Sequence, residues 1–174
     1  MARLPGDPRT NNRPPPRPTV SAQRNPPKPF VGTAGIVDVP RTVHSALLSE
    51  VRSAAHNGYD RFVWQFGGKT LPGYHVEYID KPIRKCGSGE LTEVAGDGWL
   101  EVRLYPANAH TEAGKPTVAE RERALQLGVA RELELTCDFE AVVTWVIGVT
   151  SPNRYRVLEL EEPARLVVDI LHSR

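Results

Sequence analysis

The stretch HNGYDRFVWQF, residues 56–66, decides the fold. Asn57-Gly58 is a strong hairpin signal because both positions tolerate positive φ, and the run that follows it alternates in the period of a β-strand. If residues 61–66 form a strand, three rings point to one side of it: Phe62, Trp64 and Phe66. These rings either fill a core or form a flat platform for a ligand.

We interpret the three rings as core residues. Burying them removes about 450–750 Å² from water, on the order of 10 kcal/mol as an upper estimate, and a binding platform would forgo much of that gain. The opposite side of the strand carries Arg61, Val63 and Gln65, which suit solvent better.

Similar alternation recurs along the chain and predicts an all-β fold. We expect strands over Leu48–Ala54, Arg61–Phe66, Tyr74–Ile79, Trp99–Tyr105, Glu132–Cys137, Ala141–Val149, Tyr155–Leu160 and Arg165–Ile170. About seven to eight such strands indicate an antiparallel β-sandwich or a partly closed barrel. Ala141–Val149 is apolar on both faces, which is typical of a central strand covered on both sides.

Two finer expectations concern the second half of the chain. Thr117 followed by Glu120 forms a capping box, and Gly128 suits a C-terminal end, so this segment predicts one short helix. In Glu132–Cys137, strict alternation places Leu133, Leu135 and Cys137 on one face.

The N-terminal segment differs in composition from the rest. Residues 1–29 hold nine of the 16 prolines and carry six basic residues against one acid. Proline removes backbone donors, and so few apolar groups cannot offset the entropy of ordering. We therefore divide the chain into a disordered, proline-rich basic tail over residues 1–43 and a β domain over residues 44–174.

Charge and hydropathy exclude several functional classes. The formal net charge is +1, and the residues after 29 carry 16 basic and 20 acidic groups, which argues against a nucleic-acid partner. No apolar run is long enough for a transmembrane helix, and no signal-peptide h-region is visible. Cys86 and Cys137 are either two buried thiols or one disulfide, and neither has a histidine at metal-ligand spacing.

The best candidate for a ligand platform is the strand Trp99–Tyr105. Its aliphatic side belongs to the core, so the other side presents rings and hydrogen-bonding groups suited to a sugar ring or a peptide: Trp99, Glu101, Arg103 and Tyr105. The alternative is that the rings pack under a loop and the Glu101–Arg103 pair is solvated.

Catalytic and metal motifs are weak. No nucleophile elbow, P-loop or dinucleotide fingerprint occurs, so we expect no enzyme activity, no catalytic residues and no cofactor. Ser88, His75 and Asp97 have the residue types of a catalytic triad, but no sequence motif supports this reading. A group of acids, Glu159, Glu161 and Glu162, is better read as a solvated edge than as a metal site.

Five segments, in order, resemble the AMIN-like domain of bacterial secreted and lipid-anchored proteins. They are NGYDRFVWQFGG, LPGYHVEYI, CGSGELTEVAGDGWLEVRL, LTCDFEAVVTWVIGV and PARLVVDI, and the resemblance spans Ser45–Leu171. It implies an all-β domain of cell-envelope proteins, related to AMIN domains that in several cases act through peptidoglycan, without catalytic residues to carry over. An extracytoplasmic setting is oxidising, so the resemblance favours a Cys86–Cys137 disulfide.

Two functions follow as expectations. The first is a non-catalytic, monomeric cell-envelope domain that binds peptidoglycan, another envelope glycan or an envelope protein. The second is a cytoplasmic protein–protein interaction module that uses the proline-rich tail or a strand edge.

Overall fold

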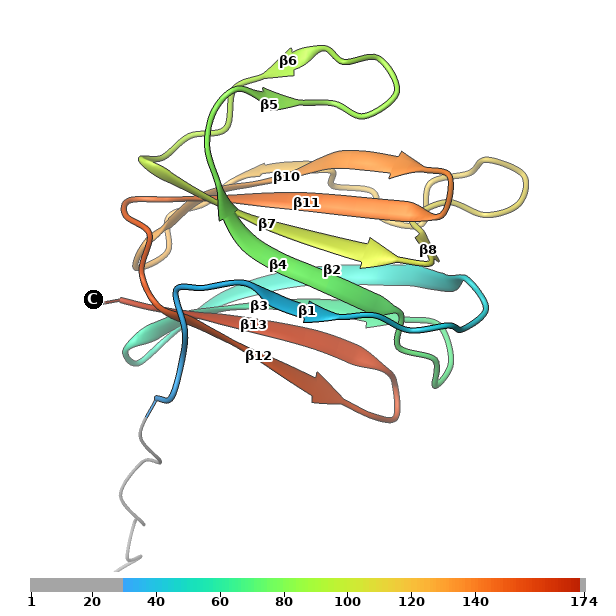
Figure 1. The fold of residues 1–174 in the computed structure, drawn as a ribbon, viewed down its shortest axis with the longest axis horizontal. Coiled ribbons are helices and arrows are strands. Elements are labelled where there is room, and N and C mark those ends of the chain that lie inside the picture. The colour runs from blue at the N-terminus through green and yellow to red at the C-terminus, as the bar shows by residue number, and fades with distance from the viewer. Residues whose placement is uncertain (1–29, 173–174) are drawn as a thin grey trace, which may run out of the picture.

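The computed structural model describes residues 30–172, which form two β-sheets packed face to face with a small hairpin on the outside (Figure 1). The six-stranded sheet has the order β1 (Val37–Val39), β4 (Gly73–Ile79), β7 (Gly98–Tyr105), β11 (Val142–Val149), β10 (Ala130–Phe139) and β9 (Glu122–Ala124). The five-stranded sheet has the order β12 (Tyr155–Leu160), β13 (Arg165–Leu171), β3 (Tyr59–Phe66), β2 (Ala46–His56) and β8 (Ala107–Asn108). The outer hairpin pairs β5 (Ile83–Arg84) with β6 (Leu91–Thr92).

The opening stretch forms the hairpin β2–β3. His56 pairs with Tyr59 across the two-residue turn, where Gly58 has a φ of 88°. Phe62 and Trp64 are fully buried and Phe66 is 1% exposed, so the prediction that the three rings fill the core is confirmed.

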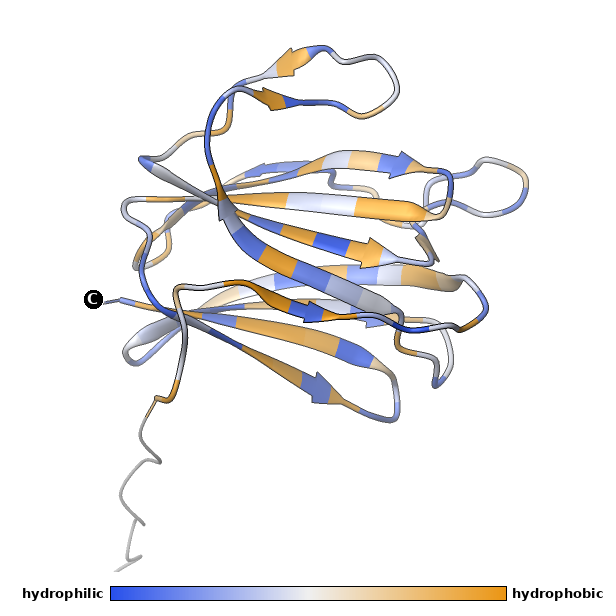
Figure 2. Ribbon diagram, in the orientation of Figure 1, coloured by the Kyte–Doolittle hydropathy of each residue, from blue (hydrophilic) through white to orange (hydrophobic). Residues whose placement is uncertain are grey.

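The core lies between the two sheets and is continuous. Both inner faces contribute large side chains to one cluster, including Phe62, Trp64, Leu166, Leu100, Trp145 and Ile147. Strands alternate between apolar and polar residues in Figure 2, except β11, which is apolar or neutral along its whole length. The expected all-β class is therefore confirmed, and of the two expected architectures the packed sheets correspond to the sandwich.

All eight expected strands are present, but residues 30–172 contain 13 strands rather than seven to eight. The additional strands have two or three residues each: β1, β5, β6, β8 and β9. Such short segments carry no readable period, because two or three residues cannot establish an alternation. All pairings are antiparallel except the parallel pair β2–β8.

The expected helix from Thr117 is wrong, since residues 30–172 contain no helix at all. The Thr117 hydroxyl donates to the Leu48 carbonyl at 2.5 Å instead of capping a helix. Arg121 reaches Asp138 at 3.0 Å, and the following residues add β9 to the edge of β10. Tertiary contacts thus override a local capping signal. Accordingly, no helix in the described part of the chain could cross a membrane.

The segment expected to be disordered, residues 1–43, can be compared with the structure only from Phe30 onward, because residues 1–29 lie outside the described part. Val37–Val39 forms β1 and pairs with β4, so the last part of this segment belongs to the sheet. The apolar Val37 and Val39 pack against the core, which explains why these residues are ordered.

Strand β11 is covered on both sides, as its sequence predicts. Its outer side meets residues 80–97, which we call the excursion, and which connect β4 to β7 through the hairpin β5–β6. Val146 packs there against Ile83 and Val94 in a small second cluster. Gly148 allows a close approach, since a Cβ at this position would lie 1.9 Å from the Ala95 carbonyl oxygen.

Candidate functional site

Strand β7 carries the predicted platform on the outer face of the six-stranded sheet. Leu100, Val102 and Leu104 are fully buried in the core. Their neighbours therefore point outward, as expected from the alternation: Trp99, Glu101, Arg103 and Tyr105.

The structure separates Trp99 from the other three residues. Its Nε1 donates to the Val94 carbonyl at 2.9 Å, and Lys81 Nζ lies 4.9 Å from the centre of its ring. Trp99 also packs against the second apolar cluster. The ring is thus covered by the excursion, and the open part of the strand is Glu101, Arg103 and Tyr105.

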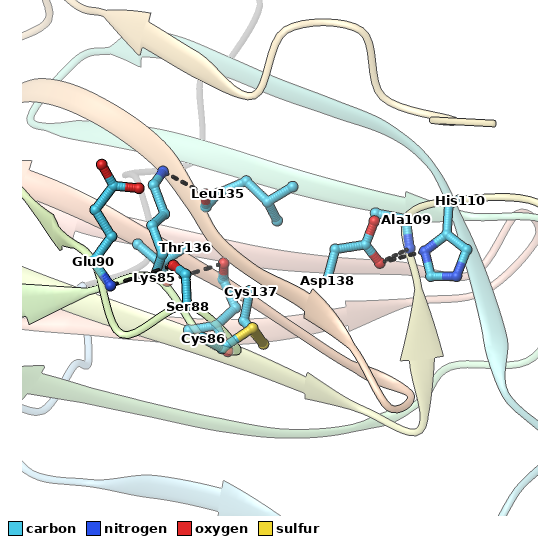
Figure 3. Close-up of a disulfide and its surroundings, with 11 residues drawn as sticks. Lys85, Cys86, Ser88, Glu90, Ala109, His110, Leu135, Thr136, Cys137 and Asp138 are labelled. Carbon is cyan, nitrogen blue, oxygen red and sulfur yellow. Dashed lines mark hydrogen bonds and ion pairs between the residues drawn. A yellow bond between two sulfur atoms is a disulfide. The ribbon is translucent and has the colours of Figure 1, made fainter. Parts of the chain in front are cut away.

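A disulfide fastens the excursion to the sheet. Cys86, just after β5, is bonded to Cys137 of β10 across 51 residues of chain, with the two Cα atoms 5.0 Å apart (Figure 3). The Cys86 amide also donates to the Thr136 carbonyl at 3.0 Å, and Lys85 Nζ donates to the Leu135 carbonyl at 3.1 Å. The bridge favoured by the family resemblance is present in this structure.

A β-bulge brings Cys137 to the outer face. Leu135 pairs with Trp145 but Cys137 pairs with Thr144, so Thr136 is an extra residue in β10. An extra residue reverses the alternation beyond it. The expectation that Cys137 shares a face with Leu133 and Leu135 is therefore wrong, and the reversal is what lets Cys137 reach the excursion.

The excursion and the outer face of the sheet together line a pocket that is open to solvent, which we call the disulfide pocket. Its volume is about 490 Å³. Its lining comes from the excursion, from β7 and from the β10–β11 hairpin: Arg84, Cys86, Glu101, Arg103, Thr136, Cys137, Phe139, Glu140, Val142 and Thr144. Two of the four predicted ligand residues, Glu101 and Arg103, thus lie in one concave site.

The pocket presents two guanidinium groups and an exposed ring. Arg103 pairs with Glu101 at 2.7 Å, whereas Arg84 donates to the Gly89 carbonyl at 2.8 Å and has no acidic partner among the described residues. Phe139 is 56% exposed at the rim. Such a lining can bind a carboxylate through Arg84 and a sugar or peptide surface through the ring.

A polar row extends from the pocket across β7, β4 and β1. The two ring nitrogens of His75 lie 3.0 Å from Asp38 and 3.0 Å from Glu77. Burial opposes protonation of His75, but the hydrogen bonds to the two carboxylates outweigh it and raise its pKa. Hydrogen bonds from His75 and from Tyr105, at 3.0 Å, lower the pKa of Asp38. The row therefore offers an imidazole and carboxylate acceptors for ligand hydroxyl or amide groups.

The candidate triad is not assembled. Ser88 lies in the turn between β5 and β6, where its hydroxyl accepts a hydrogen bond from the Glu90 amide at 3.2 Å. His75 is held by Asp38 and Glu77 instead of by Asp97.

The acids of the β12–β13 turn do not converge on a cation site. Glu159 is bonded to Arg41 at 2.8 Å and accepts a hydrogen bond from Tyr74 at 2.7 Å, and Glu162 is paired with Lys69 at 2.7 Å. Within residues 30–172, no three histidine, cysteine or acidic side chains are placed to hold a metal ion.

Several pocket residues were not predicted from the sequence, namely Arg84, Phe139, Glu140 and Thr144. They come together only through the disulfide and the bulge. The pairing of Cys86 with Cys137 is the one signal that could have indicated Arg84, which lies two residues before Cys86.

Comparison with known proteins gives one family. The family model described as the AMIN-like domain matches residues 46–172. No curated protein and no solved structure matches the chain. Since the match covers most of the chain, this protein belongs to the AMIN-like domain family.

Proposed function

We propose that this protein is a non-catalytic, extracytoplasmic binding domain of the cell envelope, and that the disulfide pocket with its polar row binds peptidoglycan or another envelope glycan or peptide. Membership of the AMIN-like family supports the envelope role. The Cys86–Cys137 bridge supports an oxidising compartment, because such bonds are rare in the cytosol.

The observation that carries the proposal is the lining of the disulfide pocket. Arg84 and Arg103 are exposed and can bind the carboxylates of a stem peptide. The ring of Tyr105 and the carboxylates of the polar row suit the apolar face and the hydroxyl groups of a sugar. The pocket and the polar row beside it on the same outer face therefore match the two parts of a peptide-substituted glycan.

The first test is retention of the full chain on purified cell-wall sacculi. The variant Arg103→Ala/Tyr105→Ala removes two open side chains of the site and leaves the buried Trp99 in place. We expect retention to fall at least about tenfold, as for the loss of two hydrogen-bonding contacts of roughly 1 kcal/mol each. Retention is measured by co-sedimentation over a range of sacculus concentrations.

The matched control is Lys69→Ala/Lys115→Ala, which removes two exposed side chains that do not line the pocket. It should be retained like the wild type, and all three proteins should unfold at similar temperatures. Equal retention of the Arg103/Tyr105 variant, or no retention of the wild type, would contradict the proposal.

The oxidation state of Cys86 and Cys137 distinguishes the proposed function from the alternative, a cytoplasmic interaction module. Protein isolated with thiols blocked at lysis should show no free thiol if it is extracytoplasmic. Two free thiols in the native protein would favour the cytoplasmic alternative instead.

A further inference from the structure

The outer face of the five-stranded sheet is rich in arginine. The strand register places five guanidinium groups on it or at its edge: Arg52, Arg61, Arg154, Arg156 and Arg165. The acids that share these strands and this face are Glu50 and Asp169. We call these arginines, with Leu158 and Leu160, the arginine face.

Two of the arginines share a single carboxylate. Asp169 is fully buried and receives Arg61 at 2.7 Å and Arg156 at 2.8 Å. Each guanidinium uses Nε and Nη2 for this contact, so the Nη1 of each has no hydrogen-bond partner among residues 30–172. The trio therefore keeps one uncompensated positive charge and two donor groups without a partner among these residues.

The positive charges of the other three arginines are balanced weakly or not at all, since two of them contact only neutral carbonyl groups. Arg154 donates to the Gly32 carbonyl at 2.9 Å, and Arg165 donates to the Pro163 carbonyl at 3.2 Å. Arg52 lies 3.4 Å from Glu50 in a half-exposed pair, which contributes little in water.

Acids also occur beyond the end of β12, where the turn carries Glu161 and Glu162, and Glu162 is engaged by Lys69. They lie in the turn next to Arg165. Even with these two acids counted, the face keeps more basic than acidic side chains.

The opposite side of the molecule has the opposite sign. The outer face of the six-stranded sheet carries Arg103 and His75 among six acids: Asp38, Glu77, Glu101, Glu122, Glu132 and Glu134. The excursion over that face adds three basic and four acidic residues, so it does not change the sign. An anionic surface would attract the arginine face and repel the face with the disulfide pocket.

Apolar groups on the arginine face indicate the kind of anionic partner. Leu158 is 37% exposed and Leu160 is 40% exposed, and both point to the same side as Arg156. The ring of Phe30 lies 4.5 Å from the Arg156 guanidinium, and the next residue, Val31, is 79% exposed. A soluble polyanion gains nothing from such residues, whereas the boundary between headgroups and acyl chains accommodates them.

We propose that the arginine face docks on an anionic lipid bilayer. The guanidinium groups contact headgroup phosphates, and Leu158 and Leu160 enter the interface. Phe30, the first described residue, lies at this face, and the sequence before it has six basic residues and one acid. Docking in this orientation turns the disulfide pocket away from the membrane, as binding to cell-wall material requires.

The test is co-sedimentation of the full chain with phosphatidylcholine vesicles, with and without phosphatidylglycerol. We expect binding only to the anionic vesicles, weakened by added salt. Arg52→Gln/Arg165→Gln should bind about 30-fold more weakly, from the usual contribution of two basic residues near an anionic surface. Leu158→Thr/Leu160→Thr should bind about tenfold more weakly at equal charge.

The matched control is Arg84→Gln/Arg103→Gln, which removes the same charge from the opposite face and should bind vesicles like the wild type. Equal losses in the control and in the Arg52/Arg165 variant would show a net-charge effect and overturn the proposal. Unchanged binding of the Arg52/Arg165 variant would assign attachment to the N-terminal segment and also overturn it. A third outcome would also overturn it: soluble polyphosphate displaces the protein from the vesicles and the leucine substitutions have no effect. The partner would then be a soluble polyanion.

Discussion

Asp60 shows how one buried residue stabilises a connection that has no regular structure. It is fully buried on β3 and accepts hydrogen bonds from the amides of Gly128, Val129 and Ala130 at 2.8–3.0 Å, and His172 Nε2 lies 2.8 Å away. Burial opposes ionisation of Asp60, but these four hydrogen bonds together lower its pKa below 3.8. The carboxylate thus fixes the end of the segment that the sequence predicts to be helical.

Replacing Asp60 by Asn should therefore destabilise the fold by about 3 kcal/mol near neutral pH. Because the folded pKa is lowered, the carboxylate stabilises the fold above the unfolded pKa, and this contribution is lost as pH falls through the folded pKa. Urea unfolding of wild type and variant at a series of pH values measures the difference. A difference that stays constant from pH 7 into the acid range would contradict this account.

The turn of the β10–β11 hairpin illustrates another residue-scale feature that sequence does not reveal. Glu140 and Ala141 have φ values of 49° and 58°, in the left-handed region that glycine and asparagine normally occupy. Neither residue type signals such a turn. Yet this turn places Phe139 and Glu140 at the rim of the disulfide pocket.

At the scale of elements, the long strands were predictable and the short ones were not. Alternating apolar residues identify strands such as Gly98–Tyr105, because one of their faces is buried over many residues. The capping signal at Thr117 failed because its hydroxyl donates a hydrogen bond to the Leu48 carbonyl in β2 instead of capping a helix. The bulge at Thr136 has no local signature, so the face of Cys137, and with it the pocket, could not be predicted.

The excursion is the element on which the candidate site depends. Within the described chain it is held by the Cys86–Cys137 bond and by the small cluster around Val146. On the loop-entropy treatment, closing 51 residues contributes about 4 kcal/mol to stability. Cys86→Ala/Cys137→Ala should therefore lower the free energy of unfolding by roughly this amount.

Urea unfolding with and without reductant measures the contribution of the bridge. Reductant should shift the midpoint of the wild type toward that of the alanine variant and leave the variant unaffected. Coincident midpoints for oxidised wild type and variant would show that the bridge does not stabilise the fold.

At the scale of the whole molecule, the two sheets share one core but present outer faces of opposite charge. One face carries the arginines around Asp169, and the other carries the acids around His75 and the disulfide pocket. The formal net charge of +1 conceals this division. Composition alone thus excludes strong steering by net charge, but only the register of the strands shows that the charges are segregated.

The most direct test of this account maps the binding site with soluble peptidoglycan fragments on the isotopically labelled full chain by NMR. We predict that amide shifts concentrate at the disulfide pocket, at Arg84, Arg103, Phe139 and Thr144, and leave the strands around Asp169 unchanged. Shifts confined to the arginine face, or no shifts at saturating fragment, would contradict the claim that the pocket is the binding surface.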